Sequence, residues 1–182
     1  MSKQIPAITP ELAEWIGRQK VFFVASAPLS ADGHVNCSPK GGNAFRVIGP
    51  RSVAYADYTG SGAETAAHVN ENGRIVLMFC AFEGPPQIAR LHGRAEVVEP
   101  SHPEYASLAG HFPSHPGVRA IIRVAVSRIS TSCGYAVPFM SYRADRDTLD
   151  RWTTSKGPEG VRAYQREKNK TSIDGLPALQ VG

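Results

Sequence analysis

The chain has 182 residues, of which 42% are hydrophobic and 20% are charged, and it carries a formal net charge of +4. This length and apolar content suit one domain with a buried core and argue against an intrinsically disordered chain. Lysines and arginines are scattered, without a basic run interleaved with aromatic residues. The positive excess therefore favours a small anionic ligand and gives no sign of nucleic-acid binding.

The cysteines and the apolar runs indicate the cellular compartment and argue against a metal-binding or membrane-spanning protein. Cys37, Cys80 and Cys133 are widely spaced and form no CxxC pair, which is typical of free thiols in a reducing compartment and indicates no metal site. No run approaches the roughly 20 apolar residues of a membrane-spanning helix. The first residues lack the apolar segment of a signal peptide. We therefore expect a single cytoplasmic domain over residues 1–182 that binds no membrane.

In chain order, short β-type runs alternate with turns and a few helical stretches. A helix is predicted to begin at Thr9-Pro10, because Thr9 can cap it and Pro10 fits its first turn. Strands are predicted at residues 21–27, 34–40, 51–58, 74–82, 87–98 and 119–129. Further helices are predicted at residues 63–71, 100–111 and 145–168, the last broken at Gly157-Pro158.

The order of these runs predicts the fold class. Most consecutive strands are joined by links too short for crossover helices, so the sheet should be largely antiparallel. We expect a mainly β protein with peripheral helices, built as a six-stranded antiparallel barrel. Its core should span about residues 20–130 and a C-terminal helical arm about residues 145–182, with the tail beyond Asn169 on the surface.

A small-residue loop after the third predicted strand is a candidate phosphate site. Gly60, Ser61 and Gly62 lead from that strand into a helix, and Thr65 lies in the first helical turn. The first amides of a helix lack internal partners and carry partial positive charge, so they favour an anion. A plain turn with a capping serine explains the same residues equally well. Glu64 would repel a phosphate unless it faces outward.

A second candidate site lies on the strand predicted at residues 34–40. Asn36, Ser38 and Lys40 alternate, which places three polar side chains on one face of a strand. That face could bind a polar ring or a phosphate. A solvated edge strand, which Pro39 would also suit, is the simpler interpretation.

Three other features of the sequence could indicate a metal-binding or catalytic site. His111 and His115 have a metal-like spacing, but Pro113 between them favours a surface loop. His92 is better explained as a structural histidine in its strand. Cys133 has no nearby residue in the sequence that could activate it, so the catalytic residues stay unknown.

Taken together, these segments resemble the pyridoxamine 5'-phosphate oxidase-related family of flavoproteins. The resemblance is carried by five runs between Val21 and Val98, in this order: VFFVASA, HVNCSPKGG, SVAYADYTGSGAETAAHV, NGRIVLMF and ARLHGRAEVV. Later runs, TSCGYAVPFMSY and NKTSIDGLP, resemble a branch of the family described only as oxidase-related and FMN-binding.

The resemblance implies a split-barrel homodimer with FMN in a cleft between the two subunits. It would act as an oxidoreductase on a small molecule or a reduced nicotinamide. Carried over position by position, it implies cofactor contacts from Asn36, Ser38, Pro39, Lys40, Asp57, Tyr58, Thr59, Gly60, Ser61, Gly62, Thr65, Gln87 and Arg90. Within this set, Ser61, Gly62 and Thr65 would meet the phosphate.

The chain departs from the family pattern in the phosphate loop. The family's Arg-Lys pair is replaced by Gly62-Ala63-Glu64-Thr65, so Lys40, Arg74 or Arg90 would have to supply the positive charge. The motifs that bind pyridoxal phosphate in the true oxidase are not recognisable. Two alternatives therefore stay open: a non-enzymatic module that binds a flavin, or a haem through His92 or His111, and a reductase that uses the deazaflavin F420.

Overall fold

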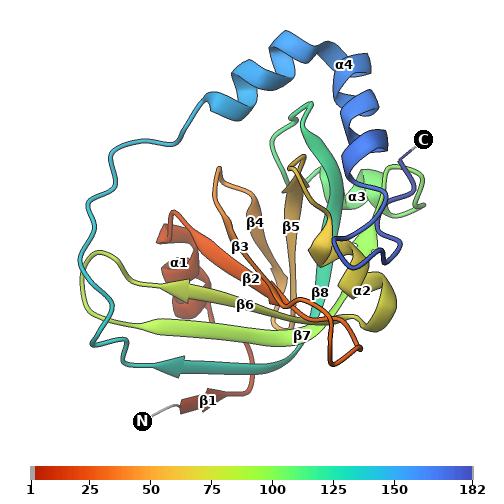
Figure 1. Ribbon diagram of the computed structural model, residues 1–182. Coiled ribbons are helices and arrows are strands. Elements are labelled where there is room, and N and C mark those ends of the chain that lie inside the picture. Colours follow the sequence, from red (N-terminus) through yellow and green to blue (C-terminus); the bar gives the residue numbers. More distant parts are fainter. Residues whose placement is uncertain (1–2, 182) are drawn as a thin grey trace.

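The computed structural model describes residues 3–181, and its centre is one antiparallel sheet (Figure 1). The strands are β1 (Lys3–Ile5), β2 (Phe22–Ser26), β3 (Asn36–Lys40), β4 (Phe45–Gly49), β5 (Ser52–Tyr58), β6 (Arg74–Cys80), β7 (Ile88–Val98) and β8 (Val118–Ser132). Their order is β3-β2-β6-β7-β8-β5-β4, and β1 pairs with β8. Every pairing is antiparallel, as the short links predict.

The sheet has eight strands rather than the six predicted. The two additional strands are the short β1 and β4, both of which lie beside longer partners. Neither has a clear sequence signal: β1 has only three residues, and β4 contains Arg46 and ends at Gly49, which weakens a β-type run. The path runs from β3 to β4, and these two strands form its edges.

The core lies on the inner face of this sheet. Phe22, Tyr55, Leu77, Leu91 and Ile122 from five different strands all belong to one cluster of buried side chains. Helix α1 (Pro10–Arg18) adds its apolar face to the same cluster and begins as predicted, with the Leu12 amide donating to Thr9 Oγ1 at 3.3 Å. No helix among residues 3–181 combines the length and apolarity needed to cross a membrane.

Helix α2 (Glu64–Asn72) follows β5 and packs on β2 and β7. It ends at Gly73, whose φ of 71° gives the left-handed turn expected of a glycine after a helix. Helix α3 is shorter than predicted, Tyr105–Ala109, because the preceding residues form turns instead of helix.

After β8 the chain leaves the sheet as a long extended connection, and helix α4 (Thr148–Lys168) then arches over one end of the strands (Figure 1). Gly157, with φ 66° and ψ 168°, divides α4 at the predicted break. The residues after α4 do not form a surface tail. Asn169 is fully buried, and Ala178 and Leu179 pack against α2. We call residues 169–181 the C-terminal segment.

Candidate functional site

The candidate site begins on the inner face of edge strand β3. Ser38 lies opposite Val24 and Lys40 lies opposite Phe22 in the pairing of β3 with β2. Because Val24 and Phe22 belong to the core, Ser38 and Lys40 point inward as well. The predicted polar row therefore lies on an inner, half-buried face of the sheet rather than on a solvated one.

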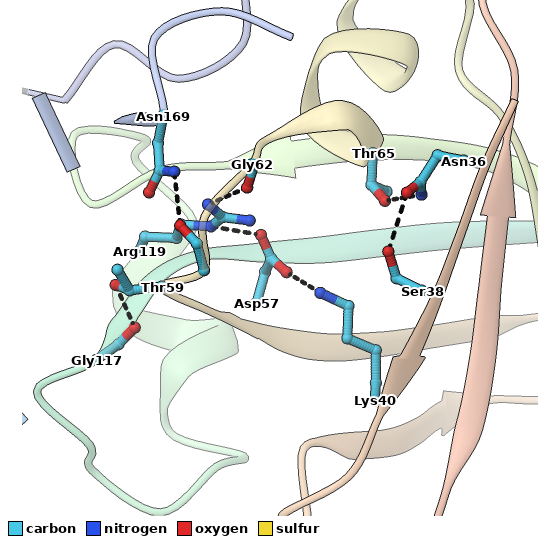
Figure 2. A network of polar contacts seen from close by, with 11 residues as sticks. Asn36, Ser38, Lys40, Asp57, Thr59, Gly62, Thr65, Gly117, Arg119 and Asn169 are labelled. Carbon is cyan, nitrogen blue, oxygen red and sulfur yellow. Dashed lines mark hydrogen bonds and ion pairs between the residues drawn. The ribbon is translucent and has the colours of Figure 1, made fainter. Parts of the chain in front are cut away.

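Lys40 is linked to a second cation inside the molecule through one shared carboxylate. Its Nζ lies 2.7 Å from Oδ1 of Asp57, and Nε of Arg119 lies 2.9 Å from Oδ2 of the same carboxylate (Figure 2). The exposed fractions are 1% for Asp57, 5% for Arg119 and 18% for Lys40. We call these three residues the charged network. Two cations and one anion leave it with one uncompensated positive charge.

The charged network sets the protonation state of Asp57. Burial acts to raise its pKa, but the charges of Lys40 and Arg119, together with their hydrogen bonds, outweigh burial and hold the pKa below its usual value. Asp57 is therefore ionised at neutral pH and orients both cations. Its neighbour Tyr55 is fully buried, and burial raises the pKa of its phenol far above the usual value.

A second polar chain links β3 to the start of α2. The Asn36 side-chain amide donates to Thr65 Oγ1 at 2.9 Å, and Ser38 Oγ donates to Asn36 Oδ1 at 3.0 Å (Figure 2). The two predicted candidates, the β3 row and the glycine-rich loop, thus meet in one place. Pro39 lies on the same strand, but its side chain alternates to the opposite face.

The loop between β5 and α2 is fixed by contacts from three directions. Arg119 donates to the Gly62 carbonyl at 2.7 Å, and the Asn169 side chain donates to the Gly60 carbonyl at 3.0 Å. Thr59 is buried, and its hydroxyl donates to the Gly117 carbonyl at 2.9 Å while accepting from Gln165 at 2.7 Å. Arg119, Gln165 and Asn169, all distant in sequence, therefore fix the conformation of this loop.

The start of α2 has an unusual cap. Its N-cap residue is Ala63, which offers no side-chain hydrogen bond to the first helical amides. Ser61 does not serve as the cap that the alternative interpretation proposed. Glu64 turns its carboxylate to the C-terminal segment, where Oε2 accepts from the Ile173 amide at 2.9 Å.

Gln87 and Arg90 lie elsewhere. Arg90 is on β7, which β2 and β6 separate from β3, and its neighbours Ala89 and Leu91 belong to the core. Because side chains alternate along a strand, Arg90 faces the outer side of the sheet, where it donates to Ser132 Oγ at 3.2 Å. One chain therefore does not bring Gln87 and Arg90 together with the β3 row.

Tyr58 also faces away from the charged network. Asp57 and Tyr58 are consecutive, so they point to opposite sides of β5. The Tyr58 ring packs edge-on against His115 with 4.9 Å between centroids, and its hydroxyl donates to the Gly42 carbonyl at 3.3 Å. Partial burial raises the pKa of the Tyr58 phenol.

Sequence reasoning missed Arg119, Gln165 and Asn169. Arg119 opens a long apolar strand, and an arginine at the buried start of such a run is the one signal that could have indicated it. Gln165 lies in the predicted helix over residues 145–168 and Asn169 lies directly after it, and the sequence does not indicate that either side chain is buried. Arg74, one of the proposed cations, instead donates to the Pro28 carbonyl at 3.1 Å, away from the network.

The histidines do not form a metal centre with neighbouring ligands. Among residues 3–181 no group of three His, Cys, Asp or Glu side chains could hold a metal ion. His92 lies on the outer face of β7, and partial burial, with help from the charges of Arg128 and Arg90, lowers its pKa. His111 lies just after α3, so the two haem-ligand candidates come from separate regions.

Comparison with known proteins agrees with this architecture. A family model described as pyridoxamine 5'-phosphate oxidase matches residues 8–133. The chain is 37% identical to the pyridoxamine 5'-phosphate oxidase family protein ustO of Aspergillus flavus over 192 residues, which cover 95% of this chain and 76% of that protein.

Solved structures show the same fold. HupZ from Group A Streptococcus has a TM-score of 0.52 and 25% identity over 67% of this chain and 91% of its own. A candidate pyridoxamine 5'-phosphate oxidase from Lactobacillus delbrueckii has a TM-score of 0.53 and 17% identity over 70% of this chain and 98% of its own. The sheet is thus of the split-barrel type, and the chain belongs to the pyridoxamine 5'-phosphate oxidase family.

Proposed function

We propose that this protein is an FMN-dependent oxidoreductase that acts on a small molecule or a reduced nicotinamide. The observation that carries the proposal is the charged network, whose single excess positive charge lies beside a helix start that lacks a side-chain cap. Both features favour a phosphate group. The family model and the Aspergillus flavus relative, both named for pyridoxamine 5'-phosphate oxidase, support a ligand that carries a phosphate group.

The residues fit a flavin phosphate and its polar chain. Lys40 would supply the positive charge that the family's missing Arg-Lys pair otherwise gives, with Arg119 and Asp57 holding it in place. Asn36, Ser38 and Thr65 offer hydroxyl and amide groups along the same face. The Glu64 carboxylate accepts from the Ile173 amide, but it keeps its negative charge and lies close to Gly62, so the cations of the network would have to outweigh it.

When bound, a flavin carries the electrons of the reaction, so the protein needs no dedicated nucleophile. The chain's own part would be to orient the cofactor and to exclude water. Asp57 stays ionised and keeps the Lys40 ammonium pointing along the inner face. Arg119 keeps the β5–α2 loop in one conformation through the Gly62 carbonyl.

We further propose that the protein is a homodimer. The outer face of the sheet carries half-buried apolar groups, among them Val76 and Met78 of β6, and Arg90 lies next to Met78. A second copy covering this face would bury them.

Titration with FMN and with riboflavin tests the cofactor. Wild-type protein should bind FMN and prefer it to riboflavin, which lacks the phosphate. Lys40→Met should weaken FMN binding by about tenfold or more, roughly 1.4 kcal/mol, and abolish the preference. Lys3→Met makes the same charge change on the exposed strand β1 and should leave FMN binding unchanged. Protein that binds neither flavin, or that prefers the deazaflavin, would refute FMN as the cofactor.

The dimer has its own test. The solution mass should be twice that of the chain, and Met78→Glu should shift it toward the monomer, because a charge would be buried in the interface. A wild-type protein that is monomeric at micromolar concentration would contradict the dimer.

A further inference from the structure

A pocket of about 820 Å³ lies at the ends of β2, β3 and β5, beside Tyr58 and apart from the charged network. Its volume is typical of pockets that hold one small organic molecule. Its lining includes Phe23, Tyr58, Phe82, Met140, Tyr142 and Leu149. Four of these six side chains are aromatic, so the pocket offers flat apolar surfaces to a ligand.

One wall of this pocket comes from the connection between β8 and α4. The Met140 amide donates to the Phe82 carbonyl at 3.0 Å, and the Tyr142 amide donates to Glu83 Oε1 at 3.0 Å. These two contacts bring the connection back to the turn after β6. The wall thus closes a space that the sheet alone would leave open, although Met140 and Tyr142 remain 55% and 43% exposed.

Several charged or titratable side chains at the pocket already contact other residues of the chain. Nε2 of His115 lies 2.7 Å from Asp150 Oδ1, and Nδ1 of His115 accepts from the Gly117 amide at 2.9 Å. The proton of a neutral His115 ring therefore lies on Nε2, toward Asp150. Lys20 Nζ lies over the Tyr142 ring, 5.1 Å from its centroid.

Counted together, the lining carries two cations, Lys20 and Arg146, and three anions, Glu83, Asp145 and Asp150, so it holds no excess positive charge. Asp145 and Arg146 are consecutive, exposed and of opposite sign. A charged ligand group placed inside would lose its hydration without gaining a buried counter-ion, which is unfavourable. An uncharged aromatic molecule would exchange water for aromatic contacts, which is favourable.

We propose that this pocket is a binding site for an uncharged aromatic molecule of two or three rings, bound between the sheet and the connection. Its role as a substrate pocket rests on the proposed flavin chemistry. Its occupancy does not, because binding can be measured on protein without flavin. The two proposals can therefore fail separately.

The experiment uses N-phenylnaphthylamine, an uncharged three-ring compound that fluoresces in apolar surroundings. Flavin-free wild-type protein should bind one molecule per chain. Anilinonaphthalene sulfonate has the same skeleton with a negative charge, and it should bind about tenfold more weakly or worse. Leu149→Trp places a larger ring in the pocket and should weaken binding of the uncharged probe by a similar factor.

Leu29→Trp is the matched control, because Leu29 is 64% exposed and lies outside the pocket lining. It should leave probe binding unchanged. Binding that is equal in both tryptophan variants would place the probe elsewhere and overturn the proposal. Equal affinity for the sulfonate would overturn the uncharged class. Displacement of the probe by FMN would assign the pocket to the flavin, whereas simultaneous binding supports a separate substrate pocket.

Discussion

The charged network and the aromatic pocket are neighbours, but they are built on opposite principles. In the network, Asp57 and Arg119 are at most 5% exposed, and each group is held by ion pairs within the chain. In the pocket, a wall of partly exposed side chains is tied back mainly through backbone amides. The network fixes charged groups in one place. The pocket presents an apolar, mainly aromatic surface.

Helix α4 connects the two regions. Its first half contributes Leu149 and Asp150 to the pocket, whereas Gln165 in its second half bonds to Thr59 behind the network. The break at Gly157 lets the two halves point in different directions (Figure 1). A change at the network should therefore affect stability most, and a change at the break should affect how the two regions are held together.

The largest expected effect follows from removing the shared carboxylate. Asp57→Asn leaves Lys40 and Arg119 close together without their counter-ion, and breaking such a buried pair typically costs about 3 to 5 kcal/mol. Denaturant-induced unfolding measures the loss. As a control, Glu14→Gln removes one partner of the exposed Glu14–Arg18 pair and should cost less than about 1 kcal/mol. Equal losses in the two variants would mean that the network is not a stabilising element.

The same carboxylate predicts a dependence on acid. Its pKa is lowered from 3.8, so its contribution to stability is present above about pH 4 and is lost as the pH falls through the lower folded-state value. The free energy of unfolding of the wild type should therefore fall more steeply below about pH 4 than that of Asp57→Asn. Parallel curves for the two proteins would show that Asp57 titrates alike in the folded and unfolded states.

The break in α4 gives a medium effect. Gly157 adopts a backbone conformation that is essentially restricted to glycine, so Gly157→Ala should cost about 1 to 3 kcal/mol. No atom lies within 4 Å of the added methyl group, so the cost would be backbone strain alone. Gly17→Ala also meets no neighbour, but it lies in the ordinary helix α1 and should stabilise by about 0.5 kcal/mol. Denaturant-induced unfolding of the two variants measures these opposite changes in the free energy of unfolding. No loss of stability in Gly157→Ala would show that residue 157 can adopt an ordinary helical conformation.

Much of this architecture could be predicted because the local signals agree. The uniformly apolar run of β6 and the cap at Thr9 indicate their elements directly. The polar row on β3 was recognised, but an alternating pattern does not reveal which face is buried. Pairing with the core strand β2 decides that. Two failures are local, the unpredicted strand β4 and the shorter helix α3, and the others concern contacts over long sequence distances.

Arg119 shows the limit most clearly. It bonds to Asp57, which is 62 residues earlier in the chain, and no local pattern connects the two. The C-terminal segment was missed for the same reason, since its polar composition predicts a surface tail. Asn169 is nevertheless buried against Gly60, which is 109 residues away. In both cases a polar residue is buried because a distant partner satisfies it, and only the folded chain identifies that partner.

The smallest expected effect concerns the contact that ties the C-terminal segment to the turn between β2 and β3. Asp174 Oδ1 lies 2.7 Å from His34 Nδ1, and Asp174 Oδ2 accepts from the His34 amide at 2.8 Å. The hydrogen bond that the His34 ring makes to Asp174, together with the charge of Asp174, raises the pKa of His34, and the bonds from His34 lower the pKa of Asp174. The pair therefore stabilises the fold fully between about pH 4 and pH 6.5, and its contribution fades as the pH rises through the folded-state pKa of His34.

His34→Gln removes the titrating ring but keeps the amide bond, so it isolates this contribution. The variant's melting temperature should lie below that of the wild type at about pH 5.5, and the difference should shrink toward zero at about pH 8.5. Asp174→Asn weakens both bonds and should retain a deficit at the higher pH. A His34→Gln deficit that is the same at both pH values would mean that the His34 ring stabilises the C-terminal segment without an ionic contribution from its pair with Asp174.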